Sequence, residues 1–288
     1  MAVAHPIVVD AEQRSARWYE ARLGKVTGSR AEDTMSFYAV TIPMIKKADE
    51  YFGDPARHYT EDEMMVLGEL KENYPFEYVL RAEVPINETA ARLNYRKQLV
   101  AERLTQMPDD LDPYITKEMR WGIMNEEIAK QKYQLRSRNI VVDAPFMHHP
   151  EIMAGASPDG TCTDRITGEI GNIEIKCLKS SNHLYEIIQQ QKVPEKYKAQ
   201  IQMQMWINGA EWCDFVGFDS RMPEGMRMFV NRVERDDFYI DEVLVPNILR
   251  FLEGVDRDEA QFHAIRKSMI ERIKKEVDAK VATGLVER

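Results

Sequence analysis

An acidic turn followed by an acid–x–lysine strand constrains this chain more than any other feature. The Ser-Pro-Asp-Gly sequence at 157–160 is a turn signal, and residues 173–178 alternate between apolar and polar as a strand does. The glycines within 167–172 predict that a hairpin closes between them. Successive side chains of a strand point to opposite faces, so Glu174 and Lys176 share one face.

This hairpin predicts a site for a hard divalent cation. Asp159 stands at the end of the first strand and can approach Glu174, and the carbonyl of Ile175 lies between the polar side chains. Two carboxylates and a carbonyl are oxygen ligands suited to Mg²⁺, which lowers the pKa of a bound water beside a phosphodiester. Lys176 is placed to orient that water or to stabilise the transition state. The alternative is an ordinary turn beside an exposed strand, the commoner origin of such a pattern taken alone.

Two further polar side chains strengthen the metal-site interpretation. Residues 117–135 predict a helix that is apolar on two sides and therefore buried, which leaves Glu126 among apolar neighbours. The alternative for Glu126 is a surface ion pair with Lys130, four residues on. Gln200 and Gln204 share one face of a helix predicted over 195–208, where they either bond to the site or form a solvated stripe.

Arg22 and Ser29 form a candidate phosphate site near the amino end of the chain. A guanidinium and a hydroxyl close to the start of a helix can hold a phosphate group. The alternative is a helix cap and a surface arginine. His148 and His149, just upstream of Asp159, are read as turn residues, with a metal or phosphate contact as the second choice.

The hydrophobic period changes along the chain, from helical to strand-like, and this sets the fold class. We expect an α/β (α+β) fold with a central mixed β-sheet flanked by helices. A single domain covers 1–288, with a helical insertion at about 36–92 and carboxy-terminal helices at about 238–280. The predicted helices are 14–35, 94–106, 117–135, 195–208, 238–252 and 257–280, and the predicted strands are 140–146, 152–157, 173–178, 213–219 and 226–234.

Composition excludes several classes of protein. The net charge of −9 argues against a general nucleic-acid binder, although a nuclease can be acidic when its carboxylates bind metal ions. Three cysteines without a zinc-ligand spacing argue against a zinc site and a disulfide framework. The sequence shows neither a long apolar run nor a secretory signal, so we expect a cytoplasmic protein without membrane contact.

Taken together, these residues resemble the lambda exonuclease and YqaJ-type viral recombinase family, a branch of the PD-(D/E)XK nucleases. The resemblance runs in chain order and covers most of the sequence outside 36–92. It rests on Trp18 to Ser29, Trp121-Gly122 with Glu126, Ala156 to Gly160, Glu174 to Cys177, Tyr197 with Ala199 to Gln202, Trp206, and Phe218 to Met222.

The resemblance implies a role for each candidate residue. Asp159, Glu174 and the Ile175 carbonyl match the metal ligands, and Glu126 matches an acid near a pair of metal ions. Lys176 and Gln200 match the residues that position the attacking water, while Arg22 and Ser29 match those that bind the 5′-terminal phosphate.

The resemblance also implies an activity and an assembly. The family's enzymes are Mg²⁺-dependent (Mn²⁺ can substitute) and ATP-independent, and they digest one strand of double-stranded DNA 5′→3′ to leave a 3′ overhang. The expected assembly is a trimeric ring (homotrimer), and the expected partner is a single-strand annealing recombinase of a phage or prophage in its bacterial host. Two alternatives remain: a dimeric endonuclease of the same superfamily, and a non-catalytic DNA-binding or assembly module.

Overall fold

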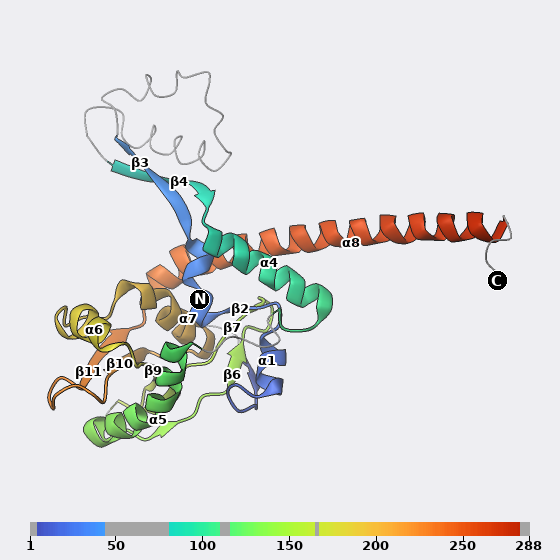
Figure 1. Ribbon diagram of the computed structural model, residues 1–288. Coiled ribbons are helices and arrows are strands. Elements are labelled where there is room, and N and C mark those ends of the chain that lie inside the picture. The colour runs from blue at the N-terminus through green and yellow to red at the C-terminus, as the bar shows by residue number, and fades with distance from the viewer. Residues whose placement is uncertain (1–4, 44–80, 110–115, 165–166, 283–288) are drawn as a thin grey trace. The chain divides into compact units, whose positions relative to one another are not determined.

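The computed structural model describes residues 5–43, 81–109, 116–164 and 167–282 (Figure 1). The chain divides into two compact units. The larger unit combines Met1–Thr34 with Arg96–Arg288, and the smaller unit is Met35–Tyr95. The smaller unit covers nearly the same residues as the predicted insertion, and every candidate site residue lies in the larger one.

A mixed five-stranded sheet is the centre of the larger unit. Its strand order is β11-β10-β9-β8-β5, in which β9 and β10 run parallel and the other neighbours are antiparallel. This mixed sheet flanked by helices confirms the predicted fold class. Its strands are β5 (Val141–Val142), β8 (Gly160–Thr163), β9 (Ile170–Lys176), β10 (Trp212–Phe218) and β11 (Met228–Glu234).

The segment between β9 and β10 is helical, as a parallel crossover requires. Its last helix, α7, ends at Gly209, whose φ of 73° is the left-handed conformation that glycine adopts readily at a helix end. The elements of this crossover are α6 (Ser180–Asn182), the π-helical turn η3 (His183–Ile188), the 3₁₀ turn η4 (Glu195–Tyr197) and α7 (Lys198–Asn208).

The two faces of the five-stranded sheet carry separate apolar clusters. Ile173 and Ile175 of β9 pack with Ala129 and Tyr133 of helix α5 (Lys117–Ser137) on one face. The other face packs against α7 and η3 through Ile187, Ile201, Met205, Cys213 and Phe215. This division follows the alternation predicted for residues 173–178, and it turns Glu174 toward α7.

A second, four-stranded sheet lies next to α7, which contacts β6 and β7 as well as β9. Its order is β1-β6-β7-β2, with β2 and β7 parallel. The single strand predicted over 140–146 is therefore wrong, because its two ends pair with different sheets. The strands are β1 (Ile7–Val9), β2 (Val26–Thr27), β6 (Phe146–His148) and β7 (Ala154–Ala156).

Helix α5 forms where it was predicted, but it is not buried on two sides. Met124 is 67% exposed and Leu135 is 82% exposed. The buried face carries Asn125 and Lys130 together with the alanine and tyrosine of the apolar cluster. Asn125 and Lys130 tolerate burial because each has a partner, respectively the hydroxyl of Ser220 at 2.9 Å and a carboxylate at 2.6 Å.

The amino-terminal part of the larger unit is less helical than predicted for 14–35. Helix α1 (Ala16–Arg22) begins at Ser15, whose hydroxyl accepts a hydrogen bond from the Trp18 amide at 3.3 Å. After it come β2 and two 3₁₀ turns, η1 (Gly28–Arg30) and η2 (Glu32–Met35).

The described ends of the predicted helical insertion are strands. β3 (Phe37–Pro43) and β4 (Arg81–Glu88) pair antiparallel, so the helices predicted at these ends are wrong. Residues 44–80, where the remaining helices were predicted, lie outside the described residues. Helix α4 (Ala90–Thr105) agrees with the helix predicted over 94–106.

The two carboxy-terminal helices predicted separately form one continuous run. A π-helical turn, η5 (Tyr239–Leu244), leads directly into α8 (Val245–Ala282), drawn in orange to red in Figure 1. The first turns of α8 bury Ile248 and Phe251, whereas residues 260–279 are exposed throughout. Among the described residues, no helix combines the length and apolar character that crossing a membrane requires.

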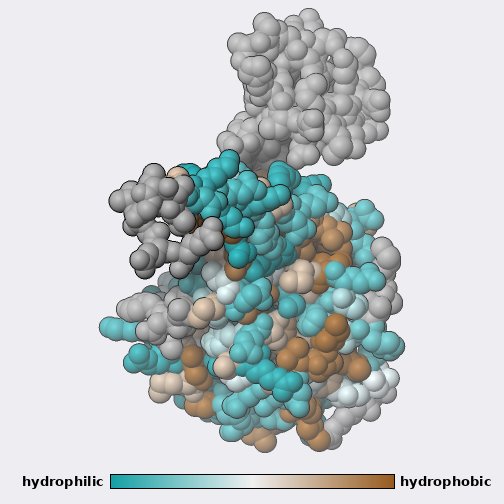
Figure 2. Space-filling model, turned by 90° about the vertical axis from the view of Figure 1, so that its right-hand side faces the viewer, coloured by the Kyte–Doolittle hydropathy of each residue, from teal (hydrophilic) through white to brown (hydrophobic). Residues whose placement is uncertain are grey.

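Hydrophobic side chains also remain on the surface. On the face shown in Figure 2, hydrophobic residues (brown) form separate patches among hydrophilic residues (teal). In the exposed part of α8, Phe262, Met269 and Ile273 are about half exposed and recur at helical spacing beside charged residues. This part of α8 is therefore amphipathic.

Candidate active site

Asp159 is fixed at the start of the predicted hairpin. Its amide donates to the Ile173 carbonyl at 3.1 Å, and its carboxylate Oδ2 accepts from the Ile175 amide at 2.6 Å. The following Gly160 has no room for a side chain, because a Cβ there would overlap the side chain of Val141. One main-chain hydrogen bond and one from the main chain to the Asp159 carboxylate therefore join the acidic turn to the acid–x–lysine strand.

Glu174 is the most completely bonded acid of the site, and it is buried. The amide of Gln200 donates to its Oε1 and the amide of Gln204 to its Oε2, each at 2.6 Å. The ammonium of Lys176 forms an ion pair with Oε1 as well. The structure therefore brings together four residues that the sequence analysis singled out.

A polar seam continues this arrangement along α7 and β9. One helical turn beyond Gln204, the amide of Asn208 donates to the side-chain oxygen of Asn172 at 2.6 Å. Gln204 and Asn208, four residues apart on α7, thus bond Glu174 and Asn172, two residues apart on β9. We call this set of contacts, made by Gln200, Gln204 and Asn208 with Glu174 and Asn172, the α7–β9 seam.

The charges at the hairpin are crowded. Burial and the negative charge of Glu174 raise the pKa of Asp159 well above its usual range, with Lys176 acting against them and Glu126 adding to them. Burial alone would lower the pKa of Lys176, but Glu174 and Asp159 outweigh it and raise that pKa. Lys176 is therefore an ammonium ion here, and the group of acids is suited to a further positive charge.

Glu126 takes part in the site through its charge, and it is paired with an arginine. Arg14 Nη2 donates to Glu126 Oε2 at 2.8 Å. The predicted alternative, an ion pair with Lys130, is wrong, because the ammonium of Lys130 contacts Asp143 at 2.6 Å. Burial, then the charges of Glu126 and Asp159, raise the pKa of Cys177 to about 12, so this thiol stays protonated at neutral pH.

Arg22 is the last residue of α1, and Ser29 lies in the turn η1. The Arg22 guanidinium stacks 3.8 Å from the ring centre of Trp18. Ser29 is exposed on η1, the turn that contacts α7. A Cβ placed on Gly28, the residue before Ser29, would lie 3.8 Å from the carbonyl oxygen of Gln200. The phosphate-binding role of Arg22 and Ser29 stays a prediction.

Two residues that support the site were missed in the sequence. The side-chain amide of Gln13 donates to Ser157 Oγ and to the Pro158 carbonyl, both at 3.0 Å, and so holds the loop that leads to Asp159. The next residue is Arg14, the partner of Glu126. Both lie in a segment without a periodic signal, and their partners are more than a hundred residues away.

The residues present fit a hydrated divalent cation. Among the described residues, no three side chains of His, Cys, Asp or Glu come together as a metal site. The predicted ligands are Asp159, Glu174, the Ile175 carbonyl and Glu126. The first three lie on the hairpin and supply two carboxylates and a carbonyl, with water completing the shell, whereas Glu126 is held in its ion pair with Arg14. Gln204 Oε1, in the same buried side chain that bonds Glu174, is an acceptor without a hydrogen-bond partner in the described structure.

Comparison with known proteins identifies the family of this chain. The family model of the YqaJ-like viral recombinase domain matches residues 17–211, which is more than half of the chain. The chain belongs to this family. The matched residues of the YqaJ-like domain include all eight predicted site residues, whereas Gln13 and Arg14 precede it.

Solved structures show the same fold. An alkaline exonuclease, LHK-Exo from Laribacter hongkongensis, is 28% identical with a TM-score of 0.64, and the similarity covers 88% of this chain and 100% of that one. LHK-Exo in complex with dAMP matches with the same identity and coverage and a TM-score of 0.65. A phage-related exonuclease from Haemophilus somnus 129PT shares the fold at 15% identity and a TM-score of 0.52, over 83% of this chain and 96% of that one. No curated protein sequence matches the chain.

The two histidines upstream of Asp159 shape a turn in this YqaJ-like domain. His149 Nδ1 accepts from the Ile152 amide at 3.0 Å and from the Glu151 amide at 3.1 Å. Its ring stacks on Trp206 at 5.4 Å between centres. The ring nitrogen of His148 in turn contacts the His149 carbonyl at 2.9 Å. These contacts agree with the turn interpretation of His149, whereas His148 is the last residue of strand β6 and the turn interpretation is wrong for it.

We expect His149 to make the fold sensitive to acid. Burial lowers its pKa in the folded chain, with Glu151 opposing and His148 assisting, so the unfolded chain binds the proton more readily. Stability is then fully present above the unfolded pKa of about 6.5 and is lost as the pH falls through the lower folded pKa. His149→Asn keeps a hydrogen-bond acceptor and does not titrate. When the pH is lowered from 7.5 to 5, the Tm of His149→Asn should fall less than the Tm of the native chain. Equal falls in Tm would contradict the role given to His149 in acid sensitivity.

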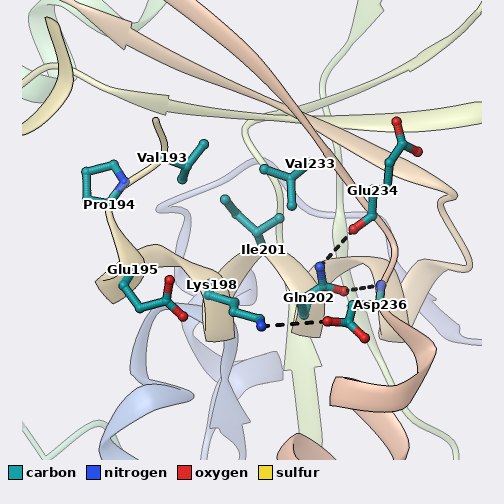
Figure 3. A pocket seen from close by; sticks show the side chains of 9 residues that line it. All are labelled: Val193, Pro194, Glu195, Lys198, Ile201, Gln202, Val233, Glu234 and Asp236. Carbon is teal, nitrogen blue, oxygen red and sulfur yellow. Dashed lines mark hydrogen bonds and ion pairs between the residues drawn. The ribbon is translucent and has the colours of Figure 1, made fainter. Parts of the chain in front are cut away.

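A separate cavity lies beside α7, away from the seam. It has a volume of about 250 Å³, and Figure 3 shows Lys198, Gln202 and Asp236 among its lining residues. Gln202 spans its floor, donating to the Glu234 carbonyl and accepting from the Asp236 amide, each at 2.9 Å. None of the predicted site residues lines this cavity.

Proposed function

We propose that this chain is a Mg²⁺-dependent, ATP-independent exonuclease that degrades one strand of linear double-stranded DNA 5′→3′ and leaves 3′ overhangs. The observation that carries the proposal is the convergence of Asp159, Glu174, Lys176 and Gln200 at the hairpin and α7. The YqaJ-like family and the similarity to LHK-Exo support it. A bound dAMP in that relative is the kind of mononucleotide that stepwise DNA digestion releases.

Asp159, Glu174 and the Ile175 carbonyl hold the cation in this proposal, with Glu126 next to a second ion. The four residues supply only oxygen ligands, which favours Mg²⁺, with Mn²⁺ as a substitute. When bound, such ions lower the pKa of a coordinated water and offset the charge of the scissile phosphate. The crowding of negative charge around Asp159 supports this role, because a bound cation relieves it.

Lys176 acts as a charged hydrogen-bond donor rather than as a base. Its raised pKa keeps it protonated, so its ammonium can stabilise the negative charge that develops on the phosphate. Gln200 bonds the same Glu174 oxygen as Lys176, so the two donors converge on one position. Together they are placed to orient the attacking water next to Glu174.

Arg22 and Ser29 recognise the 5′-terminal phosphate in this proposal. The contact of η1 with α7 and the closeness of Gly28 to Gln200 support it, because they bring this segment near the water-positioning residue. A guanidinium and a hydroxyl are suitable donors for a terminal phosphate. Recognition of that group would set the polarity of digestion.

The proposed assembly is a homotrimeric ring that acts with a single-strand annealing protein in phage-type recombination in the bacterial cytoplasm. This part rests on the family resemblance. A closed ring around DNA provides a way to remain bound between successive cuts without ATP. The overhang that such an enzyme leaves is the substrate that an annealing protein requires.

One digestion assay tests the proposed function. Linear duplexes labelled separately at each 5′ and 3′ end, with and without a 5′-phosphate, are incubated with Mg²⁺ beside a covalently closed circular duplex. We expect loss of the 5′ labels first, slower digestion of dephosphorylated ends, and an intact circle. EDTA should stop all release of nucleotides.

The same assay separates the alternatives. Cutting of the closed circle would identify an endonuclease, and no hydrolysis with any divalent ion would identify a non-catalytic DNA-binding module. Loss of the 3′ labels first would reverse the proposed polarity. Equal rates with and without the 5′-phosphate would remove the role given to Arg22 and Ser29 and leave the metal site standing.

A further inference from the structure

Arg14 has a main-chain conformation that residues with a side chain seldom adopt. Its φ is 68°, in the left-handed region, directly before the residue that caps α1. Glycine and asparagine adopt this conformation at lower cost than arginine. Strain of this kind persists where surrounding contacts fix the residue, and it is common at functional sites.

The contacts around Arg14 join two elements of the proposed site. Gln13 holds the loop before Asp159 through two hydrogen bonds of 3.0 Å. Arg14 holds Glu126 on α5 through an ion pair of 2.8 Å. Two consecutive residues thus contact both chain segments that carry the acids, and both precede the residues matched by the family model.

The ion pair places a positive charge where a divalent cation would also be attracted. The charge of Glu126 acts on Asp159, so Glu126 belongs electrostatically to the same group of acids as Asp159 and Glu174. Lys176 neutralises Glu174, and Arg14 neutralises Glu126. With Arg14 in place, the guanidinium and a cation compete for the negative charge of Glu126.

We propose that Arg14 is a positioning residue that holds Glu126 when no divalent ion is bound and thereby weakens the affinity of the site for such ions. This inference rests on the proposed function. Its purpose would be to keep the ion exchangeable and the acids ordered between cycles. The Arg14 side chain is 46% exposed, so solvent screens it and the effect should be a factor of about three to five.

Calcium binding tests this role without requiring turnover. The affinity of the full chain for Ca²⁺ is measured by isothermal titration calorimetry at low ionic strength, in the native chain and two matched variants. Arg14→Gln removes the positive charge but keeps a long side chain in the left-handed conformation. Arg14→Lys keeps the positive charge as well as the long side chain. We expect Arg14→Gln to bind Ca²⁺ about three to five times more tightly and Arg14→Lys to bind as the native chain does.

Two further measurements separate charge from backbone strain. Arg14→Gly removes the positive charge and also the backbone strain. It should therefore bind Ca²⁺ as tightly as Arg14→Gln, and its Tm should be higher than that of Arg14→Gln because glycine adopts the left-handed conformation without strain. The gain in affinity of Arg14→Gln should shrink at 0.5 M salt relative to low salt, about as the Debye length predicts.

Each outcome bears on one claim. Unchanged or weaker Ca²⁺ binding in Arg14→Gln would overturn the role of Arg14, and so would equal tightening in Arg14→Lys. Either result would leave the proposed nuclease site intact, since the native chain would still bind the ion. A native chain that binds neither Ca²⁺ nor Mn²⁺ would instead overturn the metal site, and with it the proposed function and this inference.

Discussion

Asp159→Asn should reduce strand hydrolysis by about 100-fold to 1,000-fold while the protein still folds. Asparagine retains an oxygen that can accept the hydrogen bond from the Ile175 amide, so the hairpin keeps its main contact. It lacks the negative charge that would bind the cation. Because burial and then the neighbouring acids raise the pKa of Asp159, removal of its charge should leave the Tm unchanged or raise it.

The matched control is Asp143→Asn. Asp143 is a carboxylate at the surface, with a side chain 87% exposed, that pairs with Lys130. Its substitution should leave the rate within about twofold of the native value. Rates are compared on the end-labelled linear duplex at saturating Mg²⁺. Native activity in Asp159→Asn would remove Asp159 from the proposed mechanism and, with it, the metal site at this hairpin.

Asp214→Asn should lower the free energy of unfolding by about 2–3 kcal/mol. Asp214 is 5% exposed and accepts from Arg232 Nε at 2.9 Å, from Arg232 Nη2 at 3.1 Å and from the Tyr133 hydroxyl at 2.7 Å. The Arg232 guanidinium also stacks 3.6 Å from the ring centre of Trp212. Loss of the carboxylate leaves that guanidinium with only its longer contact to Asp164, at 3.5 Å, as a counter-charge.

Urea unfolding followed by circular dichroism measures this change. Tyr133→Phe is the matched control, because it removes only the tyrosine hydrogen bond and should cost about 1 kcal/mol. Below the unfolding transition, hydrolysis by Asp214→Asn should match that of the native chain. A loss of stability no greater than that of Tyr133→Phe would show that the Arg232 ion pair adds nothing measurable.

The hairpin and its acids were predictable because their signals are local. The alternation along 173–178 places Ile173 and Ile175 in the core and Glu174 toward α7, as found. The four-residue spacing of Gln200 and Gln204 predicted a shared face, and both amides bond one carboxylate. Each of these patterns fits within a single strand or helix, where geometry follows directly from spacing.

The contacts that were not predicted join residues far apart in the sequence. Helix α5 was expected to bury its methionine and leucine stripe, but it buries Asn125 and Lys130, whose partners lie on other elements. Gln13 and Arg14 reach the loop before Asp159 and Glu126, respectively, from a segment with no periodic pattern. Polar burial of this kind depends on tertiary partners, and no single-sequence pattern reports them.

The α7–β9 seam limits where this chain can change its length. A helix advances about 6 Å in four residues and a strand about 6.6 Å in two, so the step from Gln204 to Asn208 on α7 matches the step from Glu174 to Asn172 on β9. One residue inserted into α7 would rotate the later amides by about 100°, and one inserted into β9 would send Glu174 to the opposite face. Evolution and protein engineering can therefore lengthen the exposed turn at 189–192, while α7 and β9 must be inherited at constant length, as a matched pair.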